Sequence, residues 1–260
     1  SLITGIVAGS YPALYLSSFQ PVKVLKGTFQ AGRFASLPRK VLVVLQFAVS
    51  VVLIIGTIVV YQQIKVAKSR PVGYDRESLI WTSSNSALHS KFEAMRNELK
   101  NSNLIVEMTE STSPTTDVWN TNGGFNWEGK DPNQGVDFPN SGVTYEFGKV
   151  INWKIKEGRD FSRDFAMDSA AFILNESAVK FIGFKEPIGQ TITWNDKPYK
   201  VIGVVKDMLV QSPYQPIRAS MYHLSMELEN TMIMKINPKM TASEAVNKIE
   251  TVFKKYDPGT

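Results

Sequence analysis

The side chains that most often carry catalytic or metal chemistry are sparse in this 260-residue sequence. It has no cysteine, and its two histidines, His89 and His223, are far apart and lack the spacing of a metal site. A catalytic triad therefore lacks its parts. No G-x-x-x-x-G-K-[ST] loop is present, so any ATP must be bound by another chain or by sequence outside this one. We expect no catalytic, cofactor-binding or metal-binding residues, and we expect that the chain is not an enzyme.

Three carboxylates recur at helical spacing and could form an acid cluster: Asp160, Asp164 and Asp168. Because Arg159 and Arg163 are interleaved with them, a solvated helix face is the simpler interpretation. The spacing thus predicts surface charge.

Two further acids have local structural explanations. Glu176 falls in the first turn of a predicted helix, where a carboxylate complements the helix dipole. Asp207 ends a predicted strand, where its side chain can cap a turn.

Five aromatic side chains gather in the middle of the chain: Trp119, Phe125, Trp127, Trp153 and Trp194. Such residues are more often core than ligand platform, although an exposed subset would mark a partner surface.

The net charge of +5 is confined to one end of the chain. Five bases and no acid precede position 41, and the remaining 24 bases equal the 24 acids. A DNA-binding domain would carry its excess charge on the folded part, so we expect no nucleic acid partner. A basic stretch next to a membrane span is the better interpretation.

Residues 41–60, VLVVLQFAVSVVLIIGTIVV, contain no charge and have the length of a transmembrane helix. The apolar side chains sum to roughly −4 to −9 kcal/mol on an insertion scale. A buried core helix or a pair of buried parallel strands is the alternative, and a cleaved signal peptide is a weaker one. Bases lie on both sides of the span, so base counting leaves its orientation open. Residues 2–19 are apolar and uncharged, consistent with the tail of a preceding span.

The sequence after residue 73 has the pattern of a water-soluble α+β domain. Residues 79–81 predict a strand, residues 88–100 a helix and residues 105–109 a second strand, a β-α-β unit that favours a parallel pair. Near the other end, residues 231–236 predict a strand, and Thr241 with Glu244 forms a capping box that opens a helix.

The middle of the chain has the pattern of a β-rich subdomain, with boundaries near 118 and 218. Residues 120–142 are rich in turn residues. Residues 171–174 predict a strand that leads into Asn175, an N-cap for a helix that Gly183 ends. Residues 190–194 and 199–205 predict a hairpin around Asn195 and Asp196.

Three stretches together resemble a known family. Residues 9–27, GSYPALYLSSFQPVKVLKG, are similar to the cytoplasmic stretch that precedes the second half of FtsX/MacB-like ABC-transporter permeases, especially those common in Bacteroidetes. Residues 175–190, NESAVKFIGFKEPIGQ, and residues 199–207, YKVIGVVKD, resemble the MacB-like periplasmic core domain. The sequence departs from the family pattern at Met208-Leu209, where an aromatic residue and a histidine are common, and at Ala219, where proline is common.

The resemblance implies the organisation of the chain. Residues 1–40 would be the end of a preceding membrane segment and a cytoplasmic loop, residues 41–62 a transmembrane helix of the bacterial inner membrane, and residues 63–260 a periplasmic domain with a porter-like βαβ layer and the inserted subdomain. An ABC ATPase partner would bind ATP, and the permease would form a homodimer or paired halves. The domain would couple ATP-driven motion to cargo or to a periplasmic partner.

Two rival functions follow from the residues alone. A membrane-anchored sensor would carry a signalling domain on the cytoplasmic side, whereas a permease would carry further spans. A tethered hydrolase lacks a visible set of nucleophile, base and orienting residue. Because the chain opens on Ser1 and stops directly after a helical pattern, we expect it to be a piece of a longer protein.

Overall fold

The structure, a computed structural model, describes residues 37–69, 72–212, 214–225 and 230–259, together with six residues nearer the start: Ile6, Gly9, Ser10, Ala13, Leu14 and Ser17. The chain divides into two compact units, Ser1–Lys68 and Ser69–Thr260. Most of the motif at residues 9–27, of the apolar stretch at residues 2–19 and of the basic stretch before residue 41 lies outside the described residues.

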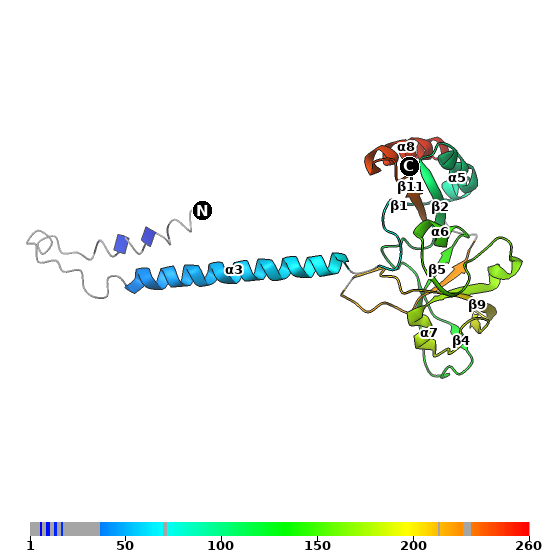
Figure 1. Cartoon of the computed structure of the whole chain (residues 1–260), viewed down its shortest axis with the longest axis horizontal. Coiled ribbons are helices and arrows are strands. Elements are labelled where there is room, and N and C mark those ends of the chain that lie inside the picture. Colours follow the sequence, from blue (N-terminus) through cyan, green and yellow to red (C-terminus); the bar gives the residue numbers. More distant parts are fainter. Residues whose placement is uncertain are drawn as a thin grey trace, which may run out of the picture. The chain divides into compact units, whose positions relative to one another are not determined.

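The first unit is dominated by one continuous helix, α3 (Leu37–Ser69) (Figure 1). Its section Lys40–Ala67 is 28 residues long, has a mean hydropathy of 2.8 and is nowhere buried by the described part of the chain. Because the section is one continuous helix, the interpretation as a pair of buried strands is wrong. The helix is long and apolar enough to cross a membrane.

The second unit is built on an 11-stranded sheet with the order β1-β11-β2-β5-β10-β7-β9-β8-β4, with β3 paired to β5 and β6 to β9. Its strands are β1 (Leu79–Ser83), β2 (Ile105–Ser111), β3 (Thr121–Asn122), β4 (Phe125–Trp127), β5 (Phe138–Val143), β6 (Ile155–Gly158), β7 (Ala171–Asn175), β8 (Thr191–Trp194), β9 (Lys197–Val205), β10 (Met221–Leu224) and β11 (Thr231–Ile236). Its helices are α4 (Ser86–His89), α5 (Phe92–Asn101), α6 (Phe147–Ile151), the 3₁₀ helix η1 (Ala166–Ala170), α7 (Glu176–Ile182) and α8 (Ala242–Tyr256). The predicted α+β class is confirmed.

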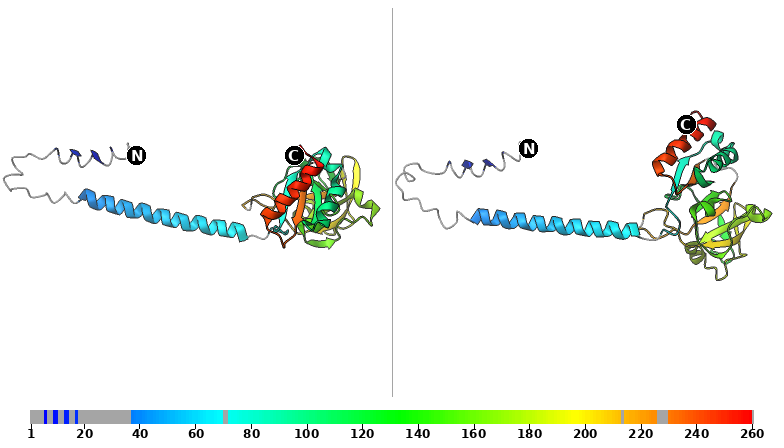
Figure 2. Two further views of the ribbon diagram at one scale, coloured as in Figure 1. Left: turned by 90° about the horizontal axis from the view of Figure 1, so that it is seen from above. Right: turned by 45° about the horizontal axis from the view of Figure 1, so that its top comes forward.

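The first layer consists of β1, β11 and β2 under the helices α5 and α8, which lie side by side (Figure 2). The predicted direct pairing of the two strands of the β-α-β unit is wrong. β11 lies between β1 and β2 and is antiparallel to both, so the two strands share a direction without touching. The inserted strand comes from more than a hundred residues later in the chain, which local patterns do not reveal.

The apolar periodicity of residues 88–99 is buried as predicted, but over two helices. Leu88 belongs to α4, while Phe92, Met95 and Leu99 belong to α5. All four pack with one face of α8, through Ala245 and its neighbours, in one core cluster. Thr241 accepts a hydrogen bond from the Glu244 N–H (3.3 Å), which confirms the predicted start of α8.

The middle region has a second, aromatic core. Phe125, Phe138 and Phe172 are almost fully buried and lie edge-on or tilted to one another. The predicted hairpin is confirmed, since β8 and β9 pair antiparallel and both turn residues, Asn195 and Asp196, have positive φ, as a two-residue type I′ turn requires.

The junction of β7 and α7 also forms as predicted. The Asn175 side chain accepts a hydrogen bond from the Ala178 N–H (2.9 Å), and Gly183 ends the helix with φ +87°. The boundaries of the inserted subdomain, near 118 and 218, stay a prediction.

Candidate functional site

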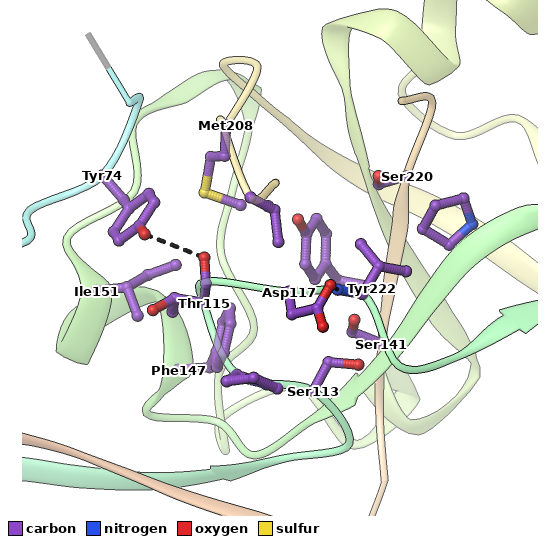
Figure 3. A pocket seen from close by; sticks show the side chains of 14 residues that line it. Tyr74, Ser113, Thr115, Asp117, Ser141, Phe147, Ile151, Met208, Ser220 and Tyr222 are labelled. Atoms are coloured by element: carbon purple, nitrogen blue, oxygen red, sulfur yellow. Dashed lines mark hydrogen bonds between the residues drawn. The ribbon is translucent and has the colours of Figure 1, made fainter. Parts of the chain in front are cut away.

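The segment of residues 72–76, here called the connector, follows α3 in sequence and leads the chain into the second unit. Three hydrogen bonds hold it to distant parts of that unit. The Leu209 N–H donates to the Val72 carbonyl (2.9 Å), and the Asp75 N–H donates to the carbonyl of Ile151, the last residue of α6 (2.8 Å). The Tyr74 hydroxyl donates to the Thr115 carbonyl (3.0 Å), as Figure 3 shows. The connector is therefore an ordered strap although it has no regular secondary structure.

Gly73 presses the connector against the segment that follows β9. Its φ of +80° lies in the left-handed region, and a Cβ placed on it would overlap the backbone carbonyl oxygen of Asp207. The left-handed backbone and the lack of space for a Cβ atom therefore both favour glycine at position 73.

An ion pair ties the connector to the first layer. The Asp75 carboxylate lies 2.6 Å from the Nζ atom of Lys235 on β11. The hydrogen bond from Lys235 holds the pKa of Asp75 below its usual range, because the ammonium favours the ionised carboxyl. The connector is therefore joined to three separate parts of the unit: β11, α6 and the segment that follows β9.

A small cavity lies beside the connector (Figure 3). Tyr74, Phe147, Met208 and Tyr222 form its apolar wall, and burial raises the pKa of the Tyr222 hydroxyl. Its volume of about 30 Å³ admits one or two water molecules but no small-molecule ligand. This cavity does not supply the ligand site that a sensor domain would need.

Asp207 links the connector to α7. Its carboxylate accepts hydrogen bonds from the Ser177 N–H (2.9 Å) and the Ser177 hydroxyl (2.7 Å), and its own N–H donates to Glu176 Oε2 (3.3 Å). The prediction that Asp207 caps a turn is replaced by a cap on the helix, because the end of β9 lies beside the start of α7. Glu176 stands in the first turn as predicted and pairs with Lys156 (2.7 Å).

The segment 207–209 therefore has contacts on two sides. On one side it receives the connector, through Leu209 and the backbone of Asp207. On the other side it caps α7 with the Asp207 carboxylate. Residues 72–73 are thus connected to α7 through the contacts of residues 207–209.

The predicted solvated face of three aspartates is wrong. No helix covers Asp160 and Asp164, and η1 begins only at Ala166. Asp168 is fully buried, and both of its oxygens accept hydrogen bonds from the Arg159 guanidinium (2.6 and 2.7 Å). Burial alone would raise the pKa of Asp168, but the hydrogen bond from Arg159 outweighs it and lowers the pKa. Asp168 and its arginine thus form a tertiary ion pair.

The two histidines are not brought together. His89 Nδ1 lies 2.8 Å from the buried Glu110 carboxylate, whereas His223 Nδ1 lies 2.9 Å from Asn140 Oδ1. Burial lowers the pKa of His223 to about 4, so its ring is neutral at ordinary pH. Among the described residues, no group of three or more His, Asp or Glu side chains could hold a metal ion. The expectation of no catalytic, cofactor or metal site stays a prediction.

Comparison with known proteins decides the family. Residues 41–252 match the family described as the MacB-like periplasmic core domain. The chain belongs to this family. The resemblance seen in the sequence is thereby confirmed, and with it the placement among ABC transporter permeases.

Individual relatives agree with this assignment. The chain is 29% identical over 125 residues to the macrolide export ATP-binding/permease protein MacB of Campylobacter fetus subsp. fetus (strain 82-40), covering 44% of this chain and 19% of the relative. It is 38% identical over 68 residues to the protein of the same name from Aggregatibacter actinomycetemcomitans, covering 25% and 11%. The chain thus spans a fifth or less of each relative.

A solved structure shows the same fold. The periplasmic region of MacB from Actinobacillus actinomycetemcomitans superposes with a TM-score of 0.50 at 18% identity, covering 71% of this chain and 85% of that structure. At 18% identity, this structural similarity supports a shared fold and no more.

Two of the three positions at which the sequence departs from the MacB-like pattern are Met208 and Leu209. Met208 and Leu209 are each 5% exposed and so belong to the core. Met208 packs in the cluster that includes Phe147 and Tyr222, beside the connector. In this periplasmic core domain, the two side chains that follow Asp207 beside the connector are therefore apolar and buried.

Some structurally important residues of the periplasmic core domain gave no sequence signal. Glu107 is 2% exposed on β2 and receives Arg96 and Lys100 at 2.8 Å each. Burial would raise its pKa, yet the hydrogen bonds from Arg96 and Lys100 outweigh burial and lower the pKa to about 2. Gly73 directly precedes the stretch with the pattern of a water-soluble domain, and its contact with Asp207 gave no sequence signal either.

The five aromatics of the middle region divide into core and surface. Phe125, Trp127 and Trp153 are buried, Trp194 is half-buried and packs against the aromatic core, and Trp119 is 44% exposed. Trp119 meets the equally exposed Trp81 edge to face, with ring centroids 5.8 Å apart. This pair is an exposed aromatic subset of the kind expected to mark a partner surface, and that role stays a prediction.

Proposed function

We propose that the chain is part of a permease subunit of an ABC-type export or mechanotransmission system, in which the periplasmic domain receives ATP-driven motion through α3 and the connector. An ABC ATPase partner supplies the motion, and the domain couples it to cargo or to a periplasmic partner. The permease works as a homodimer or as paired halves, with α3 in the bacterial inner membrane and the folded unit in the periplasm.

The observation that carries this proposal is the way the connector is held. A passive tether needs no contacts with the domain that it anchors, whereas residues 72–75 are bonded to α6, β11, residue 115 and residue 209. A pull on such a strap reaches several elements together. The family assignment and the apolar length of α3 support the same function.

Hydrogen exchange tests the proposal on the complete permease. The protein is reconstituted with its ATPase in lipid, and amide exchange is compared between the nucleotide-free and ATP-trapped complexes. We expect changed exchange at the connector, at residues 207–209 and at the first turn of α7. Helix α8, which has no hydrogen bond to the connector, serves as the internal control and should change little.

Two results would contradict the proposal. One is that no ABC ATPase associates with the permease. The other is that exchange at the connector is the same in the nucleotide-free and the ATP-trapped complexes. Either result would show that the folded unit does not receive ATP-driven motion through the connector.

A further inference from the structure

A groove larger than the small cavity lies on the second unit beside the connector. Its volume of about 390 Å³ is within the range of small-ligand sites. Tyr74 of the connector lines it, so the groove and the connector share a wall. Most of the remaining wall is apolar and is formed by Leu79, Trp81, Leu209, Val210 and Ile233. A molecule bound in this groove would therefore contact the connector itself.

The charge of the groove favours an anionic ligand. Of the described residues that line it, one is charged, and that residue is the exposed base Arg76 at the end of the connector. Among the described residues, the Arg76 guanidinium has no hydrogen-bond or ion-pair partner, whereas Lys235 is paired with Asp75. A guanidinium presents a fork of N–H donors that matches the oxygens of a phosphate. The groove thus combines an apolar wall with an unpaired phosphate-binding group.

Two exposed tryptophans mark the rim of the groove. Trp81 lines it, and Trp119 meets Trp81 edge to face, with each side chain 44% exposed. Tryptophan is enriched at the headgroup level of membranes, where an apolar ring and a polar N–H are both accommodated. An apolar wall, an unpaired guanidinium and exposed indole rings together suit an amphipathic anion such as a phospholipid.

The covalent chain keeps the groove close to the membrane that α3 is proposed to span. Helix α3 ends at Ser69, about 14 Å beyond the uncharged residues 41–60, and headgroups occupy roughly the first 5 Å of that distance. The link from Ser69 to Val72 spans at most about 11 Å. Val72 is thus held within about 20 Å of the headgroups. So short a tether gives a high effective concentration of lipid, which lets a weak site fill.

We propose that this groove binds an anionic phospholipid of the membrane that α3 spans. The phosphodiester lies against Arg76, and the glycerol and the upper part of an acyl chain lie against Trp81 and the apolar wall. Because Tyr74 is part of the groove, the bound lipid acts as a further anchor of the connector. The inference rests on the proposed function, since it needs α3 to cross a membrane beside the folded unit.

Tryptophan fluorescence tests the groove, because all five tryptophans follow α3 in the sequence and Trp81 and Trp119 are the exposed ones. The full chain is reconstituted in phosphatidylcholine vesicles that contain a small share of spin-labelled lipid, either phosphatidylglycerol or phosphatidylcholine, with the label near the top of the acyl chain. We expect the anionic label to quench about fivefold more than the neutral label, the preference that one base gives near an anionic surface. Alkaline extraction reports in each sample whether α3 is inserted.

Substitutions assign the preference to Arg76. Arg76→Gln should bring the two labels to equal quenching, whereas Arg76→Lys keeps the charge and should keep most of the preference. Lys239→Gln is the matched control, because it removes an exposed base that does not line the groove, and it should leave the preference unchanged. Trp81→Phe should remove much of the quenching by either label. A preference that survives in Arg76→Gln would overturn the proposal.

Other outcomes separate the groove from the proposed function. An inserted chain that neither label quenches, or that both labels quench equally, would overturn the lipid site alone, and the hydrogen-exchange experiment would still decide the proposed function. Glycerol phosphate free in solution should not relieve the quenching, because it lacks an acyl chain; relief would assign the groove to soluble phosphates and overturn the lipid site. A chain released by alkali would overturn both proposals.

Discussion

The connector and the start of α7 are two anchoring points of the same domain, and they are built in opposite ways. The start of α7 has a cap from its neighbour in sequence, Asn175, in the regular geometry of a helix N-terminus, and a second cap from Asp207. The connector has no regular secondary structure and is held by residues 41 to 160 positions away in the sequence. The start of α7 thus keeps one contact that depends only on the adjacent sequence, whereas every contact of the connector described above depends on distant residues.

This difference indicates which contacts would change first if parts of the domain moved. A helix start with one local cap changes only where its distant cap, Asp207, is displaced, whereas a strap bonded to several elements changes as soon as one of them moves. The segment 207–209 touches both, since Leu209 binds the connector and Asp207 caps α7. The following substitutions break these anchors separately, from the largest expected effect to the smallest.

Replacement of Gly73 should have the largest effect. Gly73→Ala puts a side chain into left-handed backbone and against the Asp207 carbonyl, so we expect a loss of about 3 kcal/mol in the free energy of unfolding. Gly129 is the matched control, because it has φ +84° and a Cβ added there would meet nothing within 4 Å. Gly129→Ala should cost only about 1 kcal/mol. Equal losses in urea denaturation would show that the contact with Asp207 does not matter.

Removal of the second cap on α7 should cost less. Asp207→Ala deletes both bonds to Ser177 while Asn175 still caps the helix, so we expect a loss of about 1 to 2 kcal/mol. Faster hydrogen exchange should be confined to the first turn of α7. Ser177→Ala removes only the hydroxyl bond and should cost about half as much. A loss of the same size in both variants would assign the whole effect to the hydroxyl.

The tyrosine of the connector should contribute about 1 kcal/mol. Tyr74→Phe deletes the bond to the Thr115 carbonyl and leaves the ring in place. Tyr214 lies 72% exposed, so Tyr214→Phe is a control that should leave the unfolding free energy unchanged. A connector held chiefly by its backbone would instead show no difference between the two variants in thermal unfolding.

The ion pair of the connector should have the smallest effect, with a dependence on pH. Both groups are partly exposed, so Asp75→Asn should cost no more than about 1 kcal/mol at pH 7. The folded pKa of Asp75 lies below its unfolded value of about 3.9, so its stabilisation is present above about pH 4 and is lost as pH falls through the folded pKa. The wild-type and variant stabilities should converge in acid. A constant difference down to pH 2 would show that the carboxylate charge is not involved.

Much of the fold could be predicted because its signals are local. The membrane-length helix follows from twenty uncharged residues, the start of α7 from Asn175 and its end from Gly183, and the turn of the hairpin from Asn195 and Asp196. Each of these depends on a few adjacent residues whose backbone preferences are strong. The family resemblance also lay in contiguous stretches, which is why it was visible in the sequence.

The sequence by itself determined the membrane-length span, the absence of thiol chemistry and the caps that begin and end the short helices, because these depend on composition or on neighbours along the chain. Only the tertiary structure decided that β11 separates β1 from β2, that Asp168 is buried against Arg159 and that Gly73 lies on Asp207. Those contacts join residues that a periodic pattern cannot relate. Such contacts form only when the whole sheet is assembled, because hydrogen bonding and burial then bring together residues that are distant in the sequence.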